Sequence, residues 1–229
     1  MRKLCVWVLR ALACHNCRAL KCRQRTAKVS QKLGDFMKQD LIAAALSLAV
    51  LSPVAAVAQE VTLAPADPQP KASALAPGLA VNYATIPSNV RSIDLARKSL
   101  ERRSEPGAPI AGLSLEDTKG GDKVLTSERA EQVAADISGF IKFDAAGTYT
   151  LDFLSNDGLQ IAIGGQEVGF YDGVHPCGYV GEIEVAVPQA GFYALEATYF
   201  QRKGTACLMM EIGPDSDGLE LASDDIFFH

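Results

Sequence analysis

Histidine is scarce in this sequence, with three residues among 229. Two of them, His175 and His229, lie in the second part of the chain, and His229 is the last residue given. A Ser-His-Asp or Cys-His arrangement in that part would have to use His175, and Cys177 lies only two positions away. No G-x-S-x-G motif or third orienting group accompanies this pair. The sequence therefore predicts a binding module and not an enzyme.

Positive charge is also scarce outside the N-terminal segment. Residues 59–229 contain 12 Lys and Arg against 25 Asp and Glu, a net charge of −13. Residues 1–58 contain 10 against 2, a net charge of +8. Nucleic-acid binding needs a cationic surface for the phosphates, and the larger segment would repel a polyanion. We therefore expect no nucleic-acid partner.

A single apolar run, residues 41–51, is followed by Pro53 and then by Ala56 and Ala58. A short apolar run before an A-x-A pattern is typical of a secretory signal peptide. A membrane-spanning helix would need about 20 apolar residues without an early proline. We predict a signal peptide over residues 37–58, cut between Ala58 and Gln59. The protein is then exported, to the periplasm, the cell surface or the medium, and meets the membrane only through an uncut signal.

The first 36 residues form a basic extension that contains four of the six cysteines. Met37 stands directly before the signal, so translation could begin there and omit the extension. The segment around Cys14 and Cys17 is one C-x-x-C pair without a second ligand pair at a finger-like spacing, a weak pattern for a metal knuckle. An arginine-rich transit segment is a further alternative.

The exported part keeps only Cys177 and Cys207. An oxidising compartment allows these two residues to form one disulfide. Two buried free thiols are the alternative, because cysteine is among the most buried residue types. The spacing alone does not decide between them.

Residues 59–77 are rich in Ala and Pro and predict a semi-extended linker without a core of its own. From residue 78 to residue 229 the pattern becomes short alternating runs separated by Gly, Asp and Asn, which indicates an all-β domain. Helical spacing predicts one short helix over residues 92–103, and residues 104–121 read as a loop. Gly164 and Gly165 predict a tight hairpin. The predicted strands are residues 79–83, 147–154, 159–163, 166–171, 179–187, 191–201 and 206–212.

The order of these segments resembles the PA14 domain family. The stretch over residues 147–168 gives a strand, an Asn-Asp-Gly turn, a second strand and a glycine hairpin, and residues 190–199 are similar to the Ala-Gly turn and strand that follow in that family. Residues 221–229 are similar to its last short strand. The resemblance covers residues 78–229 and implies an antiparallel, jelly-roll-like β-sandwich.

In several PA14 lectins a paired Asp-Asp turn holds a Ca²⁺ ion that contacts sugar hydroxyls. By position that turn is Asn156-Asp157 here, which keeps two oxygen donors but one carboxylate only. Asp172 and residues 201–204 are candidates for completing the site, and Tyr171 for stacking on a sugar. Ca²⁺ prefers six to eight oxygen ligands. Asn-Asp-Gly is also a common plain turn, and aromatic residues in strands are more often core.

Two hypotheses remain open. In the first, the resemblance implies a lectin-like module that binds a glycan or another cell-envelope component, with Ca²⁺ as its only cofactor if it has one. In the second, the domain is a structural or interaction module whose sheet edges contact an envelope protein.

Overall fold

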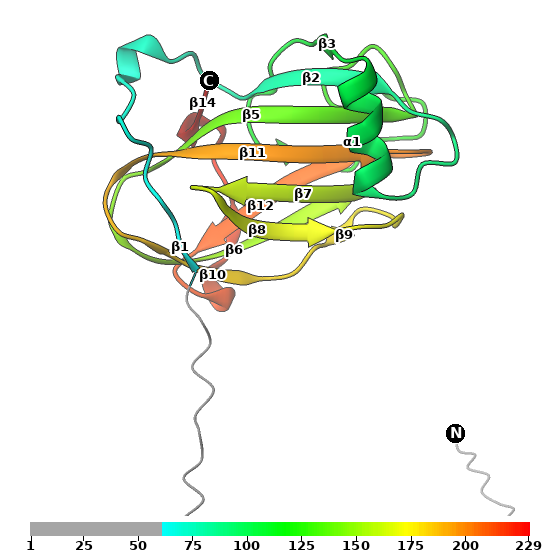
Figure 1. The fold of residues 1–229 in the computed structure, drawn as a ribbon. Coiled ribbons are helices and arrows are strands. Elements are labelled where there is room, and N and C mark those ends of the chain that lie inside the picture. The colour runs from blue at the N-terminus through cyan, green and yellow to red at the C-terminus, as the bar shows by residue number, and fades with distance from the viewer. Residues whose placement is uncertain (1–60) are drawn as a thin grey trace, which may run out of the picture. The chain divides into compact units, whose positions relative to one another are not determined.

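Two β-sheets packed face to face form the described part of the computed structural model, which covers residues 61–229 (Figure 1). The basic extension, the predicted signal peptide and its cleavage site at Ala58 and Gln59 lie outside the described residues. Among residues 61–229 we find no helix with the length and apolar character needed to cross a membrane.

The first sheet has a central strand, β6, with neighbours on both sides. Its pairings are antiparallel except for the two-residue parallel pair of β1 with β10. In spatial order its main strands are β1 (Val61–Thr62), β10 (Ile183–Val187), β6 (Gly147–Asn156), β12 (Cys207–Gly213) and β13 (Glu220–Leu221), with β4 (Ser114–Leu115) on β12 and β9 (Gly178–Tyr179) on β6.

The second sheet is wholly antiparallel and is built around the two longest strands. In spatial order its strands are β3 (Glu105–Pro106), β2 (Ala80–Thr85), β5 (Val133–Phe143), β11 (Gly191–Gln201), β7 (Gly158–Ile163) and β8 (Gln166–Tyr171), with β14 (Phe227–Phe228) on β5. Three short 3-10 helices lie in the connections: η1 (Ala72–Ala74), η2 (Ser216–Gly218) and η3 (Asp224–Ile226). The predicted antiparallel β-sandwich is confirmed.

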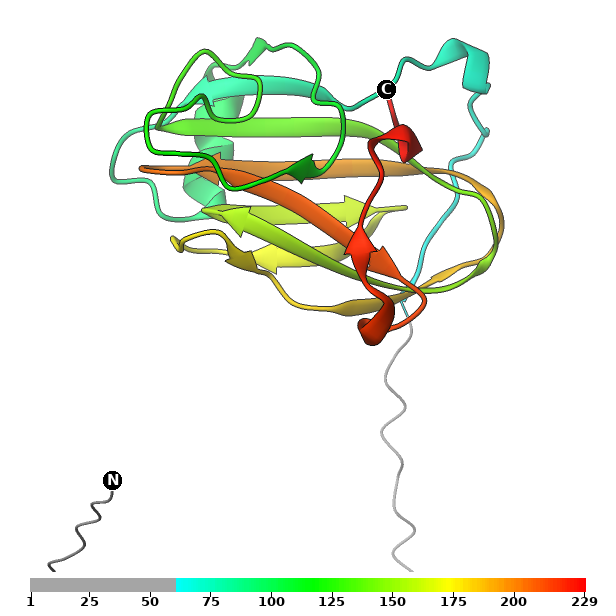
Figure 2. The ribbon, with the colours of Figure 1, turned by 180° about the vertical axis from the view of Figure 1, so that it is seen from behind.

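The main core lies between the two sheets and takes its side chains from both, among them Leu151 and Phe153 of β6 and Tyr193 and Tyr199 of β11. A second, smaller core lies under helix α1 (Ile93–Arg102), which covers the outer face of the second sheet. The predicted short helix over residues 92–103 is confirmed. Figure 2 shows the opposite side, where the C-terminal segment crosses the first sheet.

The predicted hairpin at Gly164 and Gly165 joins β7 to β8. Both residues have positive φ angles, +56° and +74°. Such a turn matches the right-handed twist of its flanking strands and needs residues without a Cβ. At Gly164 a Cβ would also lie 2.6 Å from the carbonyl O of Ala64. Both the positive φ angle and this close approach therefore disfavour a larger residue here.

The predicted strand over residues 179–187 is instead two strands, β9 and β10. Between them the N–H of Gly181 donates to Asp152 Oδ1 at 3.0 Å. The segment from β9 to β10 lies along one edge of β6 in the same sheet. Asp152 and Thr150 of β6 are buried, although the alternation of apolar and polar residues predicts that one face of this strand is exposed. Tertiary contacts, and not the local pattern, decided the burial of these polar residues.

Strand β5 is not predicted from the pattern, although it is central to the second sheet. Its inward side chains include Val133, Ile137 and Phe143, all buried. Asp136 and Gly139 interrupt the apolar character, and both residue types are depleted in strands. Pairing with β2 on one side and β11 on the other outweighs that local preference.

The predicted linker is wrong over residues 61–77, because this segment packs against the sandwich. Val61 and Thr62 pair with β10, and Leu63 is 1% exposed within the main core. Gln69 fixes the segment further: its Oε1 accepts from the N–H of Phe192 at 2.8 Å, and its Nε2 donates to the carbonyl of Phe192 at 3.0 Å. The segment has few apolar residues, which is why its composition predicts a linker. It is held by Leu63 and by hydrogen bonds to the backbone of the sandwich.

Candidate functional site

Three loops meet at the end of the sandwich where β6 ends and β7 begins, on the right in Figure 1. They connect β2 to α1 (residues 86–92), β8 to β9 (residues 172–177) and β11 to β12 (residues 202–206). Val174 of the second loop packs against the small core that contains Ile86 and Val90 of the first. Arg202 of the third donates from Nη1 to the carbonyl O of Ser88 in the first, at 3.4 Å. We call this region the loop end.

The predicted turn at Asn156-Asp157 lies beneath these loops. Because β6 and β7 belong to different sheets, the turn carries the chain from one sheet to the other and is no hairpin. The peptide bond between the two residues is cis. A turn at the end of a sandwich that binds a ligand is expected to be exposed, but Asn156 is 4% exposed and Asp157 2% exposed, so that expectation is wrong.

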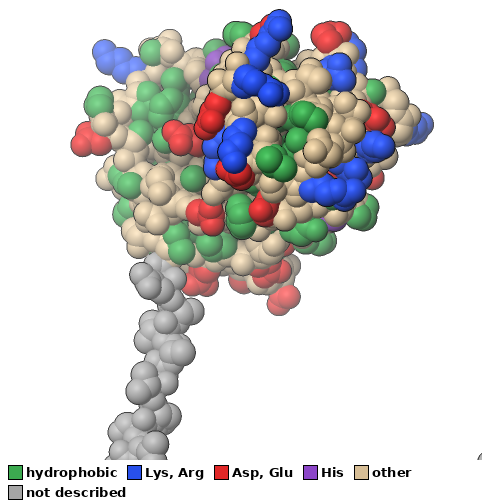
Figure 3. All heavy atoms as spheres, turned by 45° about the vertical axis from the view of Figure 1, so that its right-hand side comes forward, with side chains coloured by type: hydrophobic (Ala, Val, Ile, Leu, Met, Phe, Trp, Pro, Cys, Tyr) green, Lys and Arg blue, Asp and Glu red, His purple; other side chains and the backbone are tan. Residues whose placement is uncertain are grey.

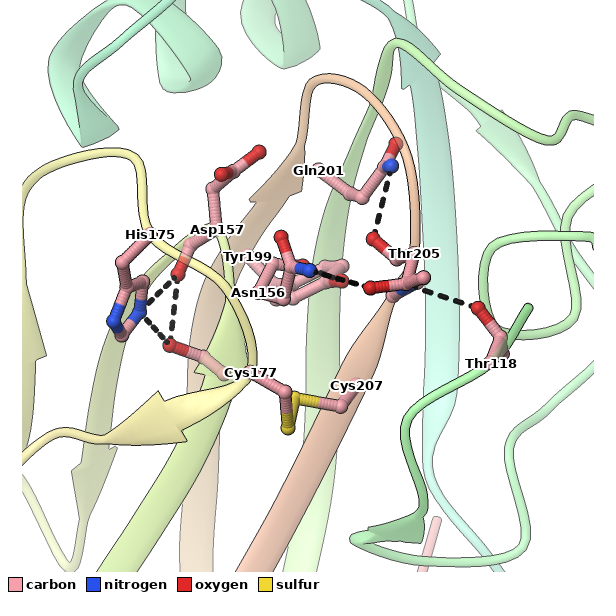
Figure 4. The surroundings of a disulfide bond; sticks show 11 residues. Thr118, Asn156, Asp157, His175, Cys177, Tyr199, Gln201, Thr205 and Cys207 are labelled. Carbon is pink, nitrogen blue, oxygen red and sulfur yellow. Dashed lines mark hydrogen bonds between the residues drawn. A yellow bond between two sulfur atoms is a disulfide. The ribbon is translucent and has the colours of Figure 1, made fainter. Parts of the chain in front are cut away.

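Asn156 forms hydrogen bonds to strand β11 and to the third loop. Its carbonyl O accepts from the hydroxyl of Tyr199 on β11. Its Nδ2 donates to Thr205 Oγ1 at 2.9 Å, which fixes the third loop (Figure 4). Gln201 donates from Nε2 to the carbonyl O of Thr205 at 3.1 Å. The amide of Asn156 is therefore part of the support of a loop.

Asp157 forms hydrogen bonds to the second and third loops and to strand β11. Its Oδ2 accepts from the N–H of Arg202 at 2.6 Å. Its carbonyl O accepts from Ser155 Oγ at 2.8 Å and lies 3.0 Å from His175 Nε2. Its N–H donates to the carbonyl O of Phe200 at 2.9 Å. Figure 4 shows the carboxylate pointing away from the disulfide, toward the loops.

Burial raises the pKa of the Asp157 carboxyl above its ordinary value of 3.8. Loss of solvent disfavours the charged form, whereas hydrogen bonds from the backbone N–H groups of Arg202 and His175 and the positive charge of Arg202 favour it. The net direction is upward. Asp157 is thus a buried carboxyl whose ionised form depends on its two neighbouring loops.

The second loop is clamped from both ends. Cys177 and Cys207 form a disulfide with an S–S distance of 2.01 Å, so the bonded alternative is correct and the loop is joined to β12. The ring of His175 stacks on Tyr171, with 3.7 Å between the ring centroids. Because the Cys177 sulfur is bonded, it offers no thiolate beside His175 for nucleophilic catalysis.

The structure gives the predicted ligand residues Tyr171 and Asp172 different roles. One face of Tyr171 is covered by His175. Asp172 Oδ1 accepts from the N–H of Ile93 at 2.6 Å, at the first residue of α1. A carboxylate is favourable at a helix N-terminus, where backbone N–H groups lack partners. Asp172 therefore fixes the helix and does not complete a site with Asp157.

The predicted Ca²⁺ ligands, Asn156 and Asp157, bring one carboxylate between them. Asn156 Nδ2 donates to Thr205, Asp157 Oδ2 accepts from the N–H of Arg202, and the positive charge of Arg202 also acts on the Asp157 carboxyl. Among residues 61–229 the one group of three side chains with metal-ligand chemistry is Asp117 with Cys177 and Cys207, and both cysteines are in the disulfide. Ca²⁺ needs six to eight oxygen ligands, and its affinity follows their negative charge.

Two residues that organise the loop end are not evident from the sequence. Thr205 and Arg202 lie about 50 positions from Asn156 and Asp157, and only the pairing of β12 with β6 brings their loop to the turn. The one available signal was the expectation that residues 201–204 lie near the turn, and the contact of Arg202 with Asp157 agrees with it.

Known proteins were compared with this chain. Residues 113–225 match the family model of the PA14 domain. The PA14 domain of the MpAFP antifreeze protein is 16% identical with a TM-score of 0.58, over 72% of this chain and 96% of that chain. A PA14 sugar-binding domain from an RTX adhesin is 16% identical with a TM-score of 0.53, over 67% and 98%.

The A domain of Epithelial Adhesin 9 from Candida glabrata, solved in complex with Galb1-3GlcNAc, is 14% identical with a TM-score of 0.57, over 74% of this chain and 95% of that chain. No curated protein matches the sequence. At these identities the likeness of structure shows the fold. The match of residues 113–225 to the family model identifies a PA14 domain in this chain, and the likeness of structure agrees with its fold.

Proposed function

We propose that this domain is a lectin-like, non-catalytic module that binds a glycan at the loop end. The observation that carries the proposal is one buried turn that fixes the second and third loops, while Arg202 of the third loop binds the first. Asp157 binds Arg202 and His175, Asn156 binds Thr205, and the disulfide joins the second loop to β12. Loops held by a rigid scaffold are the usual place of binding residues in β-sandwiches.

The similar solved structures support the same class of ligand. The RTX adhesin domain is described as sugar-binding, and the adhesin domain from Candida glabrata was solved with a galactose-containing disaccharide. Because Asn156 and Asp157 are buried, we place the contacts to the glycan on the loops above them. On this proposal binding does not need Ca²⁺.

A glycan array of the full chain, with and without a chelator, tests the proposal. We expect a restricted set of glycans to be retained equally in both conditions, because protein groups and not a metal would hold the sugar. Binding that disappears with the chelator would restore the Ca²⁺ prediction. Absence of any retained glycan in both conditions counts against a lectin-like role.

One observation favours the second hypothesis, an interaction module of an envelope assembly. Strand β8 ends the order of the second sheet, and its Phe170 is 48% exposed. A free strand edge can pair with a strand of another protein. Pull-down from envelope extracts tests this hypothesis. A stoichiometric protein partner that Phe170→Ser releases, together with no glycan selectivity, would favour it.

Both hypotheses require the protein to be exported. We propose export because residues 37–58 have the pattern of a signal peptide and because Cys177 and Cys207 form a disulfide. Disulfides persist mainly in oxidising compartments.

A further inference from the structure

Three cationic side chains at the loop end have no ion-pair partner. Arg91 belongs to the first loop, and Arg202 and Lys203 to the third. Four ion pairs occur within residues 61–229, and none includes these three residues. Figure 3 turns this end toward the viewer and shows Lys and Arg side chains gathered on it and over α1. Such a rim is unusual on a segment with a net charge of −13.

Three carboxylates at the same end each accept a backbone N–H: Asp157 from Arg202, Asp172 from Ile93, and Glu131 from Gly204 at 2.9 Å. Asp157 thus contacts the backbone of Arg202 and does not form a close ion pair with its guanidinium. The acids fix the loops, and within residues 61–229 none of them forms an ion pair with Arg91, Arg202 or Lys203.

Arg202 has unused hydrogen-bonding capacity. A guanidinium group offers five N–H donors in a planar fork. Within residues 61–229 this group makes one hydrogen bond, the 3.4 Å contact of Nη1 with the carbonyl O of Ser88, and its buried Nε has no partner there. A planar carboxylate can accept two parallel hydrogen bonds from such a fork. Lys203 is exposed beside it and adds a second positive charge.

We propose, on the basis of the proposed function, that the glycan bound at the loop end is a carboxylated sugar. Arg202 binds the sugar carboxylate, and Lys203 and Arg91 strengthen that attraction from the rim. The negative charge of the remaining surface limits this preference to short or isolated anionic groups, because a long polyanion would also meet the acidic faces.

A matched pair of oligosaccharides tests the proposal: trigalacturonate and its neutral, carboxyl-reduced counterpart. We expect the full chain to bind the carboxylated form at least about tenfold more tightly, since a hydrogen-bonded charge pair is worth about 1.5–3 kcal/mol. Binding should weaken as NaCl is raised from 20 mM to 500 mM, because salt screens exposed charges. Isothermal titration measures both effects.

Two rim variants assign the residues. Arg202→Gln and Lys203→Gln should each reduce affinity for the carboxylated probe several-fold and leave affinity for the neutral probe unchanged. Lys71→Gln is the matched control, because it removes the same charge from an exposed residue beside η1. Lys203 makes no contact that could unfold the domain, so its variant stays informative if Arg202→Gln is unstable.

The outcomes separate the two proposals. Equal or tighter binding of the neutral probe, unaffected by both variants, overturns the carboxylate preference and leaves glycan binding standing. Loss of binding in Lys71→Gln as large as in the rim variants also overturns the assignment to the loop end. Failure to bind either probe, with no retained glycan on the array, overturns both proposals.

Discussion

Individual polar residues explain why the loop end is ordered. Asn156 and Asp157 would be costly to bury without partners, and each makes hydrogen bonds to two or more neighbours. Asn156 and Asp157, which the sequence suggested as ligands of an ion, hold the loops in place. Arg202 is the residue with hydrogen-bond donors left for a ligand. Two predictions test these roles.

The first concerns the pH dependence of stability at Asp157. Because its pKa is raised in the folded chain, the folded state binds the proton more tightly than the unfolded state. The free energy of unfolding should therefore decrease as pH rises from the ordinary value of 3.8 through the raised folded pKa. Asp157→Asn removes that decrease, which urea unfolding at a series of pH values measures.

The matched control is Asp136→Asn, which makes the same change at an exposed position of β5. Its pH profile should follow that of the parent protein. The free energy of unfolding of the parent protein minus that of Asp157→Asn should therefore fall as pH rises. If this quantity rises with pH or stays constant, the assigned direction of the pKa shift is wrong.

The second concerns the N-terminus of α1. Asp172→Ala removes the acceptor of the Ile93 N–H and should lower the free energy of unfolding by about 1 kcal/mol. Asp172→Asn keeps an oxygen acceptor and should lose less. Thermal unfolding compares the two variants. If Asp172 were a ligand residue instead, both variants would keep full stability and lose glycan binding.

At the scale of elements, the segment over residues 61–77 is the least expected part of the fold. It adds β1 to the first sheet and covers the hairpin at Gly164, whose carbonyl O accepts from the N–H of Ala64 at 3.1 Å. This segment is part of the domain, so its removal should unfold or weaken the sandwich.

Leu63→Ala tests this role directly. Truncating a fully buried leucine should cost about 2–5 kcal/mol, because it removes apolar contacts and leaves a cavity. Leu221→Ala, at a half-exposed position of β13, is the control and should cost much less. Chemical denaturation measures both. Equal, small effects would mean that the segment is the loose linker that its composition suggested.

The disulfide acts on another element, the second loop. Cys177 and Cys207 are 30 residues apart, so the bond restricts a large loop in the unfolded chain. The double variant Cys177→Ser, Cys207→Ser should lose about 3–4 kcal/mol of unfolding free energy in the chain-entropy model. Comparing unfolding with and without reductant measures this loss, and reductant should not affect the variant. Unchanged stability would show that the bond is absent or that loop order does not depend on it.

At the scale of the whole molecule, the charge distribution and the predicted export belong together. The basic first 58 residues are expected to be removed, which leaves an acidic domain with a cationic loop end. The intact mass of the exported protein tests this prediction: we expect a species that begins at Gln59 and lacks two hydrogens from the disulfide. A species that begins at Met1 or Met37 would contradict cleavage after Ala58.

The strands and the hairpin of the sandwich were largely accessible from the sequence, because alternation and glycine pairs act locally. Residues 191–201 became β11 with the predicted limits, and Gly164 and Gly165 formed the predicted turn. Strand β5 was not accessible, since Asp136 and Gly139 weaken its local signal and its stability comes from two neighbours distant in sequence.

The candidate site was accessible in part. Asn156 and Asp157 could be placed by their resemblance to a family pattern, but their burial depends on loops 20 to 50 positions away. No local pattern reports what covers a side chain. Asp172 was misjudged for the same reason, because its partner Ile93 lies 79 residues earlier.

The sequence by itself determined the all-β architecture, the acidic character of the domain and the presence of one cysteine pair, because each follows from residue types and their local order. Only the tertiary structure decided that residues 61–77 belong to the sandwich, that the cysteines meet, and that the acids of the loop end accept backbone N–H groups while its cations form no ion pair within residues 61–229. Those properties depend on contacts between segments far apart in the chain, and such contacts are fixed when the two sheets pack.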